Sequence, residues 1–195
     1  MAGVSIFSRH QVRRFIGLSL RYVAMGICVL AAAVFSPLKL GVVAGRSMSP
    51  SLQDRSFYLL DRTYFRAASL KRNDVVVFRR DGMNYIKRVI GVPGDTIYTL
   101  RYQDSDQDEL VMDWQLDLVR RAVSRHPWKN TVRLVETHLG PDEYFVVGDN
   151  LTESRDSRAF GPITASTIQG RMLFAPAPRP EMLHLARANG RPSKS

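Results

Sequence analysis

Cysteine is nearly absent from the sequence, and the residues that usually bind metals form no motif. The single cysteine, Cys28, excludes an intrachain disulfide and leaves the redox compartment open. The acidic run Asp104-Ser105-Asp106-Gln107-Asp108 lacks the glycine and the distal glutamate of a calcium-binding loop. The four histidines stand apart at positions 10, 126, 138 and 184. The sequence therefore predicts neither a metal nor a cofactor.

The N-terminal part of the chain has no acidic residue, and the first one in the sequence is Asp54. The whole chain has a formal net charge of +10, and its first segment carries Arg9, Arg13 and Arg14. Beyond residue 46 the 22 basic and 18 acidic residues are close to balanced, which argues against a nucleic-acid-binding surface. Basic residues beside an apolar run are more typical of membrane orientation or import.

A long apolar run follows the basic N-terminal segment, which we assign to residues 1–14. Residues 15–38 contain Arg21 as their only charge, and a bilayer span needs about 20 apolar residues. We therefore expect a transmembrane anchor over 15–38, with the N-terminus on the matrix or cytoplasmic side. A cleaved secretory signal is the alternative, because Ala31–Ala33 would supply small residues before a cut.

Short runs rich in β-branched and aromatic residues replace the helical pattern after Ser51. They are Phe57–Leu60, Val75–Phe78, Tyr85–Val92 and Tyr144–Val147. Asp81–Gly82 separates the second run from the third and predicts a hairpin. We therefore expect a mainly β domain over residues 39–175, with an excursion of unassigned structure at about 101–137. The tail at 176–195 is predicted to be poorly ordered.

Ser47 and Lys87 are candidates for nucleophilic catalysis without a histidine. A serine hydroxyl needs a neighbouring base, and a neutral lysine can serve. Strand alternation places Lys87 on one face with Tyr85 and Val89. To act near neutral pH, its pKa must fall by roughly 3 units from about 10.4, which corresponds to about 4 kcal/mol against the ammonium form. By itself, the strand pattern is more typical of a lysine that reaches solvent.

A third segment, GDN at 148–150 followed by SRDSR at 154–158, favours a catalytic role for Lys87 over that of an ordinary strand lysine. The chain resembles the type I signal peptidase family in three places: Ser47-Met48 with Pro50, Lys87-Arg88 followed by Gly94-Asp95, and this third segment. The resemblance covers roughly residues 41–174. Members of that family are serine-lysine peptidases that remove leader peptides. The resemblance thus implies a β domain of antiparallel sheets behind one N-terminal transmembrane helix, and a serine endopeptidase.

The resemblance also implies a role for the matching residues. Ser47 would attack the scissile carbonyl, while Lys87 would take the hydroxyl proton and later pass it to the leaving amine. Met48 would help to line the substrate region. Ser154 would hydrogen-bond the lysine amine and orient it.

Three further positions complete the implied site. Asp156 and Arg158 would form a structural ion pair beside it. Gly45 departs from many bacterial relatives, which have a serine there that contributes to the oxyanion hole. The backbone N–H of Ser47 would then carry more of that role.

We expect the chain to be a mitochondrial inner-membrane peptidase subunit that faces the intermembrane space. Lys87 stands where the endoplasmic reticulum branch has histidine, so that branch does not fit. The implied partners are leader-bearing precursor proteins, membrane lipid and a related peptidase subunit in a heterodimer. A bacterial signal peptidase I of the plasma membrane and a catalytically silent membrane subunit are the alternatives. A self-cleaving serine-lysine repressor fits less well, because its cleavage-like dipeptide, Ala44-Gly45, is too close to Ser47.

Overall fold

The computed structural model describes residues 20–28, 31, 36–63, 70–125 and 131–177. The chain divides into two compact units, Met1–Pro37 and Leu38–Ser195, which are described separately. In the first unit, residues 20–28 are helical. Among the described residues, no helix is both long and apolar enough to cross a membrane. The anchor predicted over 15–38 falls partly on residues outside the described ranges, as does nearly all of the tail at 176–195.

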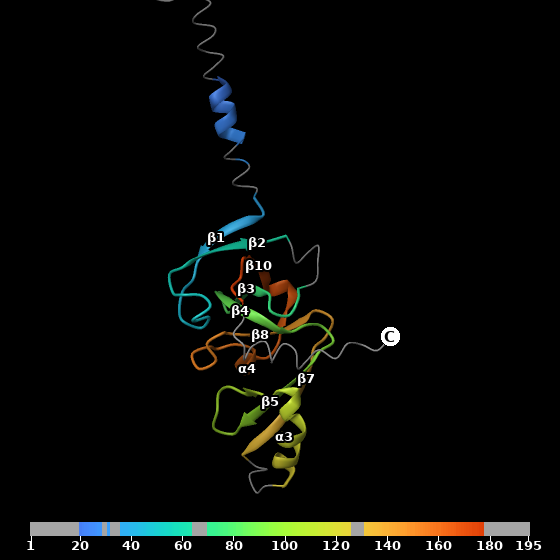
Figure 1. Cartoon of the computed structure of the whole chain (residues 1–195). Helices are drawn as coiled ribbons and strands as arrows, with labels where there is room; N and C mark the ends of the chain where they lie inside the picture. The colour runs from blue at the N-terminus through green and yellow to red at the C-terminus, as the bar shows by residue number, and fades with distance from the viewer. Residues whose placement is uncertain (1–19, 29–30, 32–35, 64–69, 126–130, 178–195) are drawn as a thin grey trace, which may run out of the picture. The chain divides into compact units, whose positions relative to one another are not determined.

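A seven-stranded antiparallel sheet forms the body of the second unit, with the strand order β1-β2-β10-β3-β4-β8-β9 (Figure 1). Its strands are β1 Leu38–Val42, β2 Phe57–Asp61, β3 Val75–Arg80, β4 Met83–Gly91, β8 Glu143–Val147, β9 Ile163–Thr164 and β10 Ile168–Leu173. The hairpin predicted at Asp81–Gly82 is confirmed, because Arg80 of β3 pairs with Met83 of β4. The prediction of a mainly β fold with antiparallel sheets is confirmed as well.

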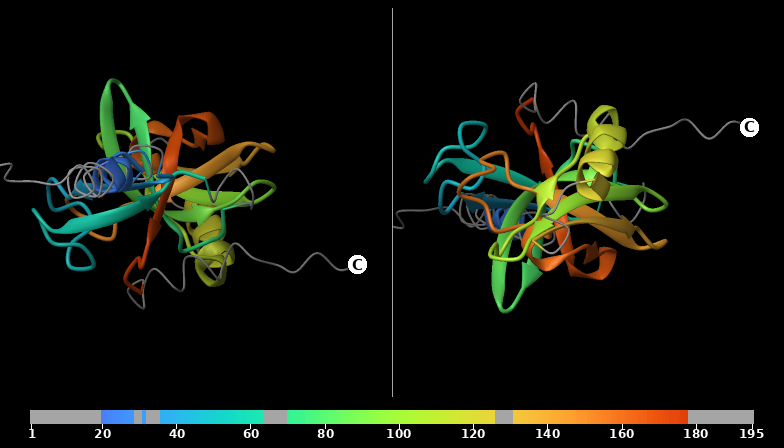
Figure 2. Two further views of the ribbon diagram at one scale, coloured as in Figure 1. Left: turned by 90° about the horizontal axis from the view of Figure 1, so that it is seen from above. Right: turned by 90° about the horizontal axis from the view of Figure 1, so that it is seen from below.

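A smaller three-stranded sheet is built from the chain between β4 and β8, which are neighbours in the large sheet. Its order is β6-β5-β7, with β5 at Thr96–Tyr102, β6 at Glu109–Leu110 and β7 at Val132–His138. Helix α3, Asp113–Arg125, packs against β7 (Figure 2). The excursion that the sequence left unassigned is therefore a small α/β layer, apart from residues 126–130, which are not described.

Three clusters of buried apolar side chains support these sheets. Strand β4 contributes to two of them, because Val89 and Ile90 point to opposite faces. The Val89 cluster fills one face of the large sheet, while the Ile90 cluster joins β4 and β8 to Ile97 of the small sheet. The third cluster lies under the segment that carries Ser47 and consists of Val43, Met48, Leu52, Val75 and Met172.

Two short helical turns complete the second unit. Helix α4, Ser157–Phe160, has Asp156 as its N-cap, and the Asp156 carboxylate accepts from the Arg158 N–H. Gly161 ends α4 at φ 80°, a conformation that favours glycine. The 3₁₀ turn η2, Ala165–Thr167, leads into β10. Helix α4 contacts β8, and the Val146 N–H donates to the Ser157 hydroxyl, so the SRDSR segment lies beside β8.

Candidate active site

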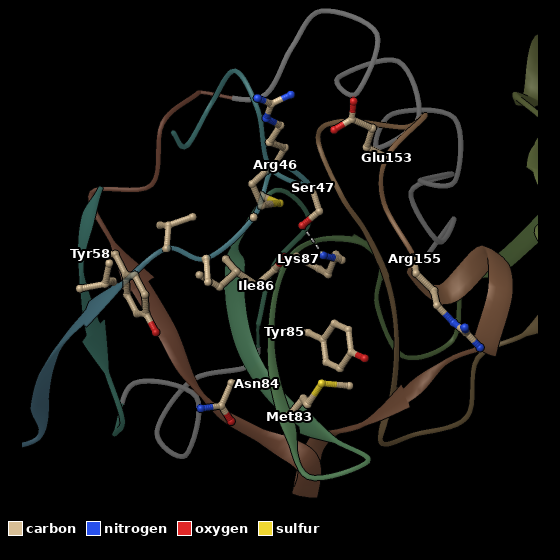
Figure 3. A pocket seen from close by; sticks show the side chains of 15 residues that line it. Arg46, Ser47, Tyr58, Met83, Asn84, Tyr85, Ile86, Lys87, Glu153 and Arg155 are labelled. Carbon is tan, nitrogen blue, oxygen red and sulfur yellow. Dashed lines mark hydrogen bonds between the residues drawn. The ribbon is translucent and has the colours of Figure 1, made fainter. Parts of the chain in front are cut away.

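The predicted nucleophile, Ser47, lies in the segment between β1 and β2 (Figure 3). Two backbone hydrogen bonds close this segment, from the Val43 N–H to the Ser56 carbonyl and from the Arg55 N–H to the Val43 carbonyl, each 2.8 Å. The adjacent Met48 side chain is 1% exposed and packs in the third cluster. Burial of that neighbour fixes the position of the serine, whose own side chain remains partly exposed.

Lys87 lies in β4 and directs its amine at Ser47 (Figure 3). Its Nζ donates to the Oγ of Ser47 at 2.7 Å and to the carbonyl oxygen of Ile86 at 3.0 Å. The residue is 2% exposed. The structure thus brings together the two residues that the sequence singled out, 40 positions apart.

Burial lowers the pKa of the Lys87 amine from 10.5 to about 8. Desolvation is the largest cause, and the positive charge of Arg158 acts in the same direction. The carboxylates of Asp156 and Asp149 oppose this by favouring the ammonium form, so they raise the pKa. With a pKa of about 8, about a tenth of the amines are neutral at pH 7. This lysine is therefore suited to act as a base near neutral pH.

Asp156 and Arg158 form the ion pair that the resemblance implied. The Arg158 Nε donates to Oδ1 of Asp156 and its Nη2 to Oδ2, both at 2.9 Å. The Asp156 side chain is fully buried and that of Arg158 is 8% exposed. Two parallel bonds hold the carboxylate in one orientation. This pairing reduces the pull of Asp156 on the lysine proton.

Ser154 has a different partner from the one expected. Its hydroxyl donates to Oδ2 of Asp156 at 2.7 Å, whereas the described hydrogen bonds of Lys87 go to Ser47 and the Ile86 carbonyl. An ionised carboxylate is a stronger acceptor than an amine and lies only two residues away. In this structure Ser154 therefore contacts Asp156 and has no described hydrogen bond to Lys87, and its role in orienting the lysine stays a prediction.

The GDN segment holds the carbonyl groups around Ser47, a contact that the sequence reasoning missed. The Asn150 N–H donates to the Ser47 carbonyl at 3.0 Å, and the Asn150 side-chain amide donates to the Arg46 carbonyl at 3.2 Å. Gly148 lets the segments approach closely, because a Cβ there would lie 2.1 Å from the Ser154 Oγ and 2.5 Å from the Ser47 carbonyl oxygen. The site therefore depends on a tight junction between two distant loops.

A second buried ion pair lies behind Lys87 and was also missed. The Arg88 guanidinium donates to both oxygens of Asp149, at 2.8 and 2.6 Å, and the two side chains are 1% and 0% exposed. Arg88 also donates to the Asn73 carbonyl at 2.9 Å. The only signals for this ion pair in the sequence were that Arg88 follows Lys87 and that Asp149 is the middle residue of GDN. Despite this pairing, the Asp149 carboxylate still favours the ammonium form and raises the pKa of Lys87, against the larger effect of desolvation.

Gly45 adopts a φ of +94°, which L side chains rarely tolerate. A Cβ there would meet no atom within 4 Å, so the backbone angle and not space favours glycine. Its N–H donates to Oδ1 of Asp54 at 2.8 Å. Among the described hydrogen bonds, none uses the Ser47 N–H as donor. That group is therefore the backbone donor available beside the serine hydroxyl.

A pocket of about 440 Å³ opens over the Ser47–Lys87 pair (Figure 3). The segment 42–48 lines one side and β4 residues 83–87 line the other, with Tyr58, Glu153 and Arg155 completing it. Gly45 and Met48 are both among the lining residues. Within the described ranges, no group of three or more histidine, cysteine, aspartate or glutamate residues is placed to hold a metal. The pocket thus gives access to the hydrogen-bonded pair of the Ser47 hydroxyl and the Lys87 amine.

Comparisons with known proteins identify the family of the chain. Residues 14–175 match the family model of signal peptidase, peptidase S26. Signal peptidase I of Bacillus amyloliquefaciens is 32% identical over 134 residues, covering 68% of this chain and 72% of that protein. Signal peptidase IB of Staphylococcus aureus (strain COL) is 31% identical over 158 residues, covering 73% and 79%. A crystal structure of a signal peptidase I from Enterococcus faecalis V583 has 25% identity and a TM-score of 0.34, covering 54% of this chain and 98% of that one. The chain therefore belongs to the signal peptidase S26 family and is a serine endopeptidase of the signal peptidase I type.

Proposed function

We propose that the protein removes leader peptides from precursor proteins with Ser47 as nucleophile and Lys87 as general base. The observation that carries this proposal is the 2.7 Å contact between Ser47 Oγ and a buried amine whose pKa is lowered to about 8. The neutral amine takes the hydroxyl proton as Oγ attacks the scissile carbonyl. It then returns that proton to the leaving amine, and water hydrolyses the acyl-enzyme by the same steps.

The oxyanion of the tetrahedral intermediate is stabilised by the Ser47 N–H in this proposal. That donor supports the role because it is free of the hydrogen bonds described for the segment, whereas the Gly45 N–H is used by Asp54. Asp156 and Arg158 fix the local geometry, and Ser154 acts through Asp156. Met48 packs in the third apolar cluster next to the nucleophile and contributes to the pocket wall.

The substrate binds as an extended peptide between residues 42–46 and 83–87. Strand β1 is at the edge of the large sheet, and the pairing of β4 with β8 covers only Arg88, Val89 and Gly91, so residues 83–87 have one unpaired edge. A peptide in extended form can hydrogen-bond to such edges. The pocket of about 440 Å³ beside them would receive substrate side chains near the cleaved bond.

A membrane anchor over residues 15–38 would hold the enzyme at the height of its membrane-tethered precursors. The run of apolar residues with Arg21 as its only charge supports this part of the proposal. We place the protein in the mitochondrial inner membrane, with its catalytic domain in the intermembrane space and a related subunit as partner, because the N-terminal part is basic and free of acids. The bacterial relatives favour the plasma membrane as the second candidate. Fractionation of cells that express the tagged chain decides between these two compartments.

The test of the dyad is cleavage of a leader-bearing precursor by the purified full-length protein. We expect wild type to release the leader, and Ser47→Ala and Lys87→Ala each to abolish release. Ser105→Ala and Lys71→Ala are matched controls, because both residues are exposed and lie outside the pocket. Equal turnover by wild type and both dyad variants would refute the dyad. No turnover by any of them would favour a catalytically silent subunit.

A further inference from the structure

The chain leaves β10 through a turn at Phe174, whose φ of 55° lies in the left-handed region. A bulky residue rarely adopts this conformation, and it persists only where the surrounding structure favours it. The Phe174 side chain is 93% exposed, so contacts of its ring do not hold the turn. The turn is therefore held by the strand before it and by the residues after it.

The two residues after the turn reach separate parts of the active-site framework. Ala175 packs against the third apolar cluster, which contains Met48, the neighbour of the nucleophile. The Pro176 carbonyl accepts from Nη2 of Arg88 at 3.2 Å. Arg88 follows Lys87 in β4 and is 1% exposed. The turn thus brings the C-terminal segment into contact with residues adjacent to both members of the candidate dyad.

A continuous series of contacts leads from Pro176 to the nucleophile. The Arg88 guanidinium, which binds the Pro176 carbonyl, also holds both oxygens of Asp149 at 2.8 and 2.6 Å. The next residue, Asn150, donates its N–H to the Ser47 carbonyl at 3.0 Å. Two bonds from one guanidinium fix the orientation of a carboxylate. A displacement of Arg88 would therefore also displace the loop that contacts Ser47.

We propose that residues 174–177, here called the C-terminal latch, position the nucleophile segment by holding Arg88 and Met48 in place. The latch acts on the loop at 148–150 through the Pro176 carbonyl, and on the apolar cluster beside Ser47 through Ala175. None of its residues lines the pocket over the dyad, so it is a positioning element and not part of the substrate site. This inference rests on the proposed peptidase function and assigns a role in it to a segment outside the three active-site segments.

Two substitutions of Phe174 in the full-length protein test the latch, because they change the backbone direction without removing buried side-chain contacts. Proline fixes φ at about −65° and cannot form the turn. Glycine adopts a positive φ readily and retains it, which makes Phe174→Gly the matched control. We expect Phe174→Pro to lower kcat by at least about fivefold and to leave KM within about twofold, because a misplaced nucleophile slows the chemical step while the pocket is unchanged. Phe174→Gly should leave both constants within about twofold of the wild-type values.

Hydrogen exchange followed by mass spectrometry tests the contacts of the latch without a substrate. Exchange should accelerate in peptides covering residues 148–151 of Phe174→Pro, because the Asn150 N–H no longer has a fixed acceptor in Ser47. Phe174→Gly should exchange as wild type does. Strands β5 and β7 of the small sheet are the internal reference and should not change. Equal acceleration in these strands would overturn the inference, since it would indicate a general loss of stability.

Ala175→Gly decides the question if Phe174→Pro does not fold. It removes the methyl group that packs against the third cluster, and it should lower kcat by at least about twofold with KM unchanged. Wild-type kcat in whichever of these two variants folds would overturn the role of the latch, as would an equal loss of kcat in Phe174→Gly and Phe174→Pro. Absence of cleavage by wild type would instead overturn the peptidase proposal, and exchange at residues 148–151 would still decide whether the latch positions that loop.

Discussion

At the scale of single residues, the proposed mechanism makes activity depend on the protonation of one amine, that of Lys87. The pKa of Lys87 is lowered to about 8, mainly by desolvation. Only the neutral amine can accept the Ser47 proton, so kcat/KM should increase with pH between 6 and 9, with a midpoint at about 8. A pH profile of peptide cleavage measures this. A rise that is centred near 10.5, the ordinary value for lysine, would contradict the role of burial.

The same shift makes Lys87 costly for folding. Its pKa is lower in the folded protein than in the unfolded chain, so the folded state is penalised below about pH 8 and the penalty is relieved as pH rises from about 8 to 10.5. A displacement of this size corresponds to about 3 kcal/mol. We therefore expect Lys87→Met to increase the free energy of unfolding at pH 7 by up to this amount.

Urea unfolding of the Ser47→Ala protein with and without Lys87→Met measures this difference and avoids self-digestion. The advantage of methionine should shrink between pH 7 and 9.5, because the wild-type lysine becomes neutral over that range. Lys71→Met, at an exposed position, should give no such pH-dependent difference. A Lys87→Met protein that is less stable at pH 7 would mean that the hydrogen bonds of the ammonium outweigh its desolvation.

At the scale of elements, the sequence predicted those strands whose apolar residues are continuous. Strands β2, β3, β4 and β8 fall where the sequence placed them, because each is rich in β-branched or aromatic side chains. Strand β1, Leu38–Val42, begins at the last residue of the apolar run at 15–38, which was assigned to a different element, so its start could not be recognised. Strand β5, Thr96–Tyr102, and strand β7, Val132–His138, pair with each other although α3 separates them in the sequence, and no pattern within either strand indicates that pairing.

Asp108 joins the small sheet to the active-site helix α4. Its carboxylate accepts from the Thr99 hydroxyl at 3.0 Å and from the Arg101 guanidinium at 2.9 and 3.0 Å, and its N–H donates to the Arg158 carbonyl at 3.0 Å. Asp108→Ala removes the side-chain bonds and leaves the buried Thr99 hydroxyl without this acceptor. We expect a loss of about 1–3 kcal/mol in the free energy of unfolding.

Hydrogen exchange followed by mass spectrometry locates that loss. Exchange should accelerate most in β5 and β6, which Asp108 connects, and less in β3 and β4 of the large sheet. Asp106→Ala is the control, because Asp106 is exposed in the same loop and has no described ion pair. Equal acceleration in both sheets would show that they unfold as one unit.

At the scale of the whole molecule, the active site is assembled from three segments that are far apart in the chain. Their order allowed the resemblance to predict Ser47 and Lys87, because each segment carries a recognisable local pattern. The contacts between the segments could not be predicted in the same way. The partner of Ser154 and the burial of the Arg88–Asp149 pair depend on how closely the strands approach, which no single segment encodes.

Gly148 is the position at which this assembly can be tested. A methyl group there would collide with the Ser154 Oγ and the Ser47 carbonyl oxygen. We expect Gly148→Ala to lower kcat/KM by at least about tenfold and to destabilise the protein by about 1–3 kcal/mol, because the nucleophile loop must shift. Peptide cleavage and urea unfolding measure the two effects.

Gly26→Ala provides the matched control, because a Cβ at Gly26 would meet nothing within 4 Å. It should leave kcat/KM unchanged and should not lower the free energy of unfolding, because alanine is favoured over glycine in a helix by about 1 kcal/mol. A Gly148→Ala protein with full activity would mean that the loops tolerate a wider separation than the structure has.

The hydrogen bond from the Asn150 side chain to the Arg46 carbonyl connects positions 104 residues apart. A ribosome adds about 5–20 residues per second, so Ser47 leaves it about 5 to 20 seconds before the segment that holds it in place. In the last part of that interval the growing chain contains the proposed nucleophile, Ser47, and the proposed base, Lys87, but not the loop that contacts Ser47. Under the proposed mechanism, catalytic competence therefore arises only after residue 150 has been synthesised.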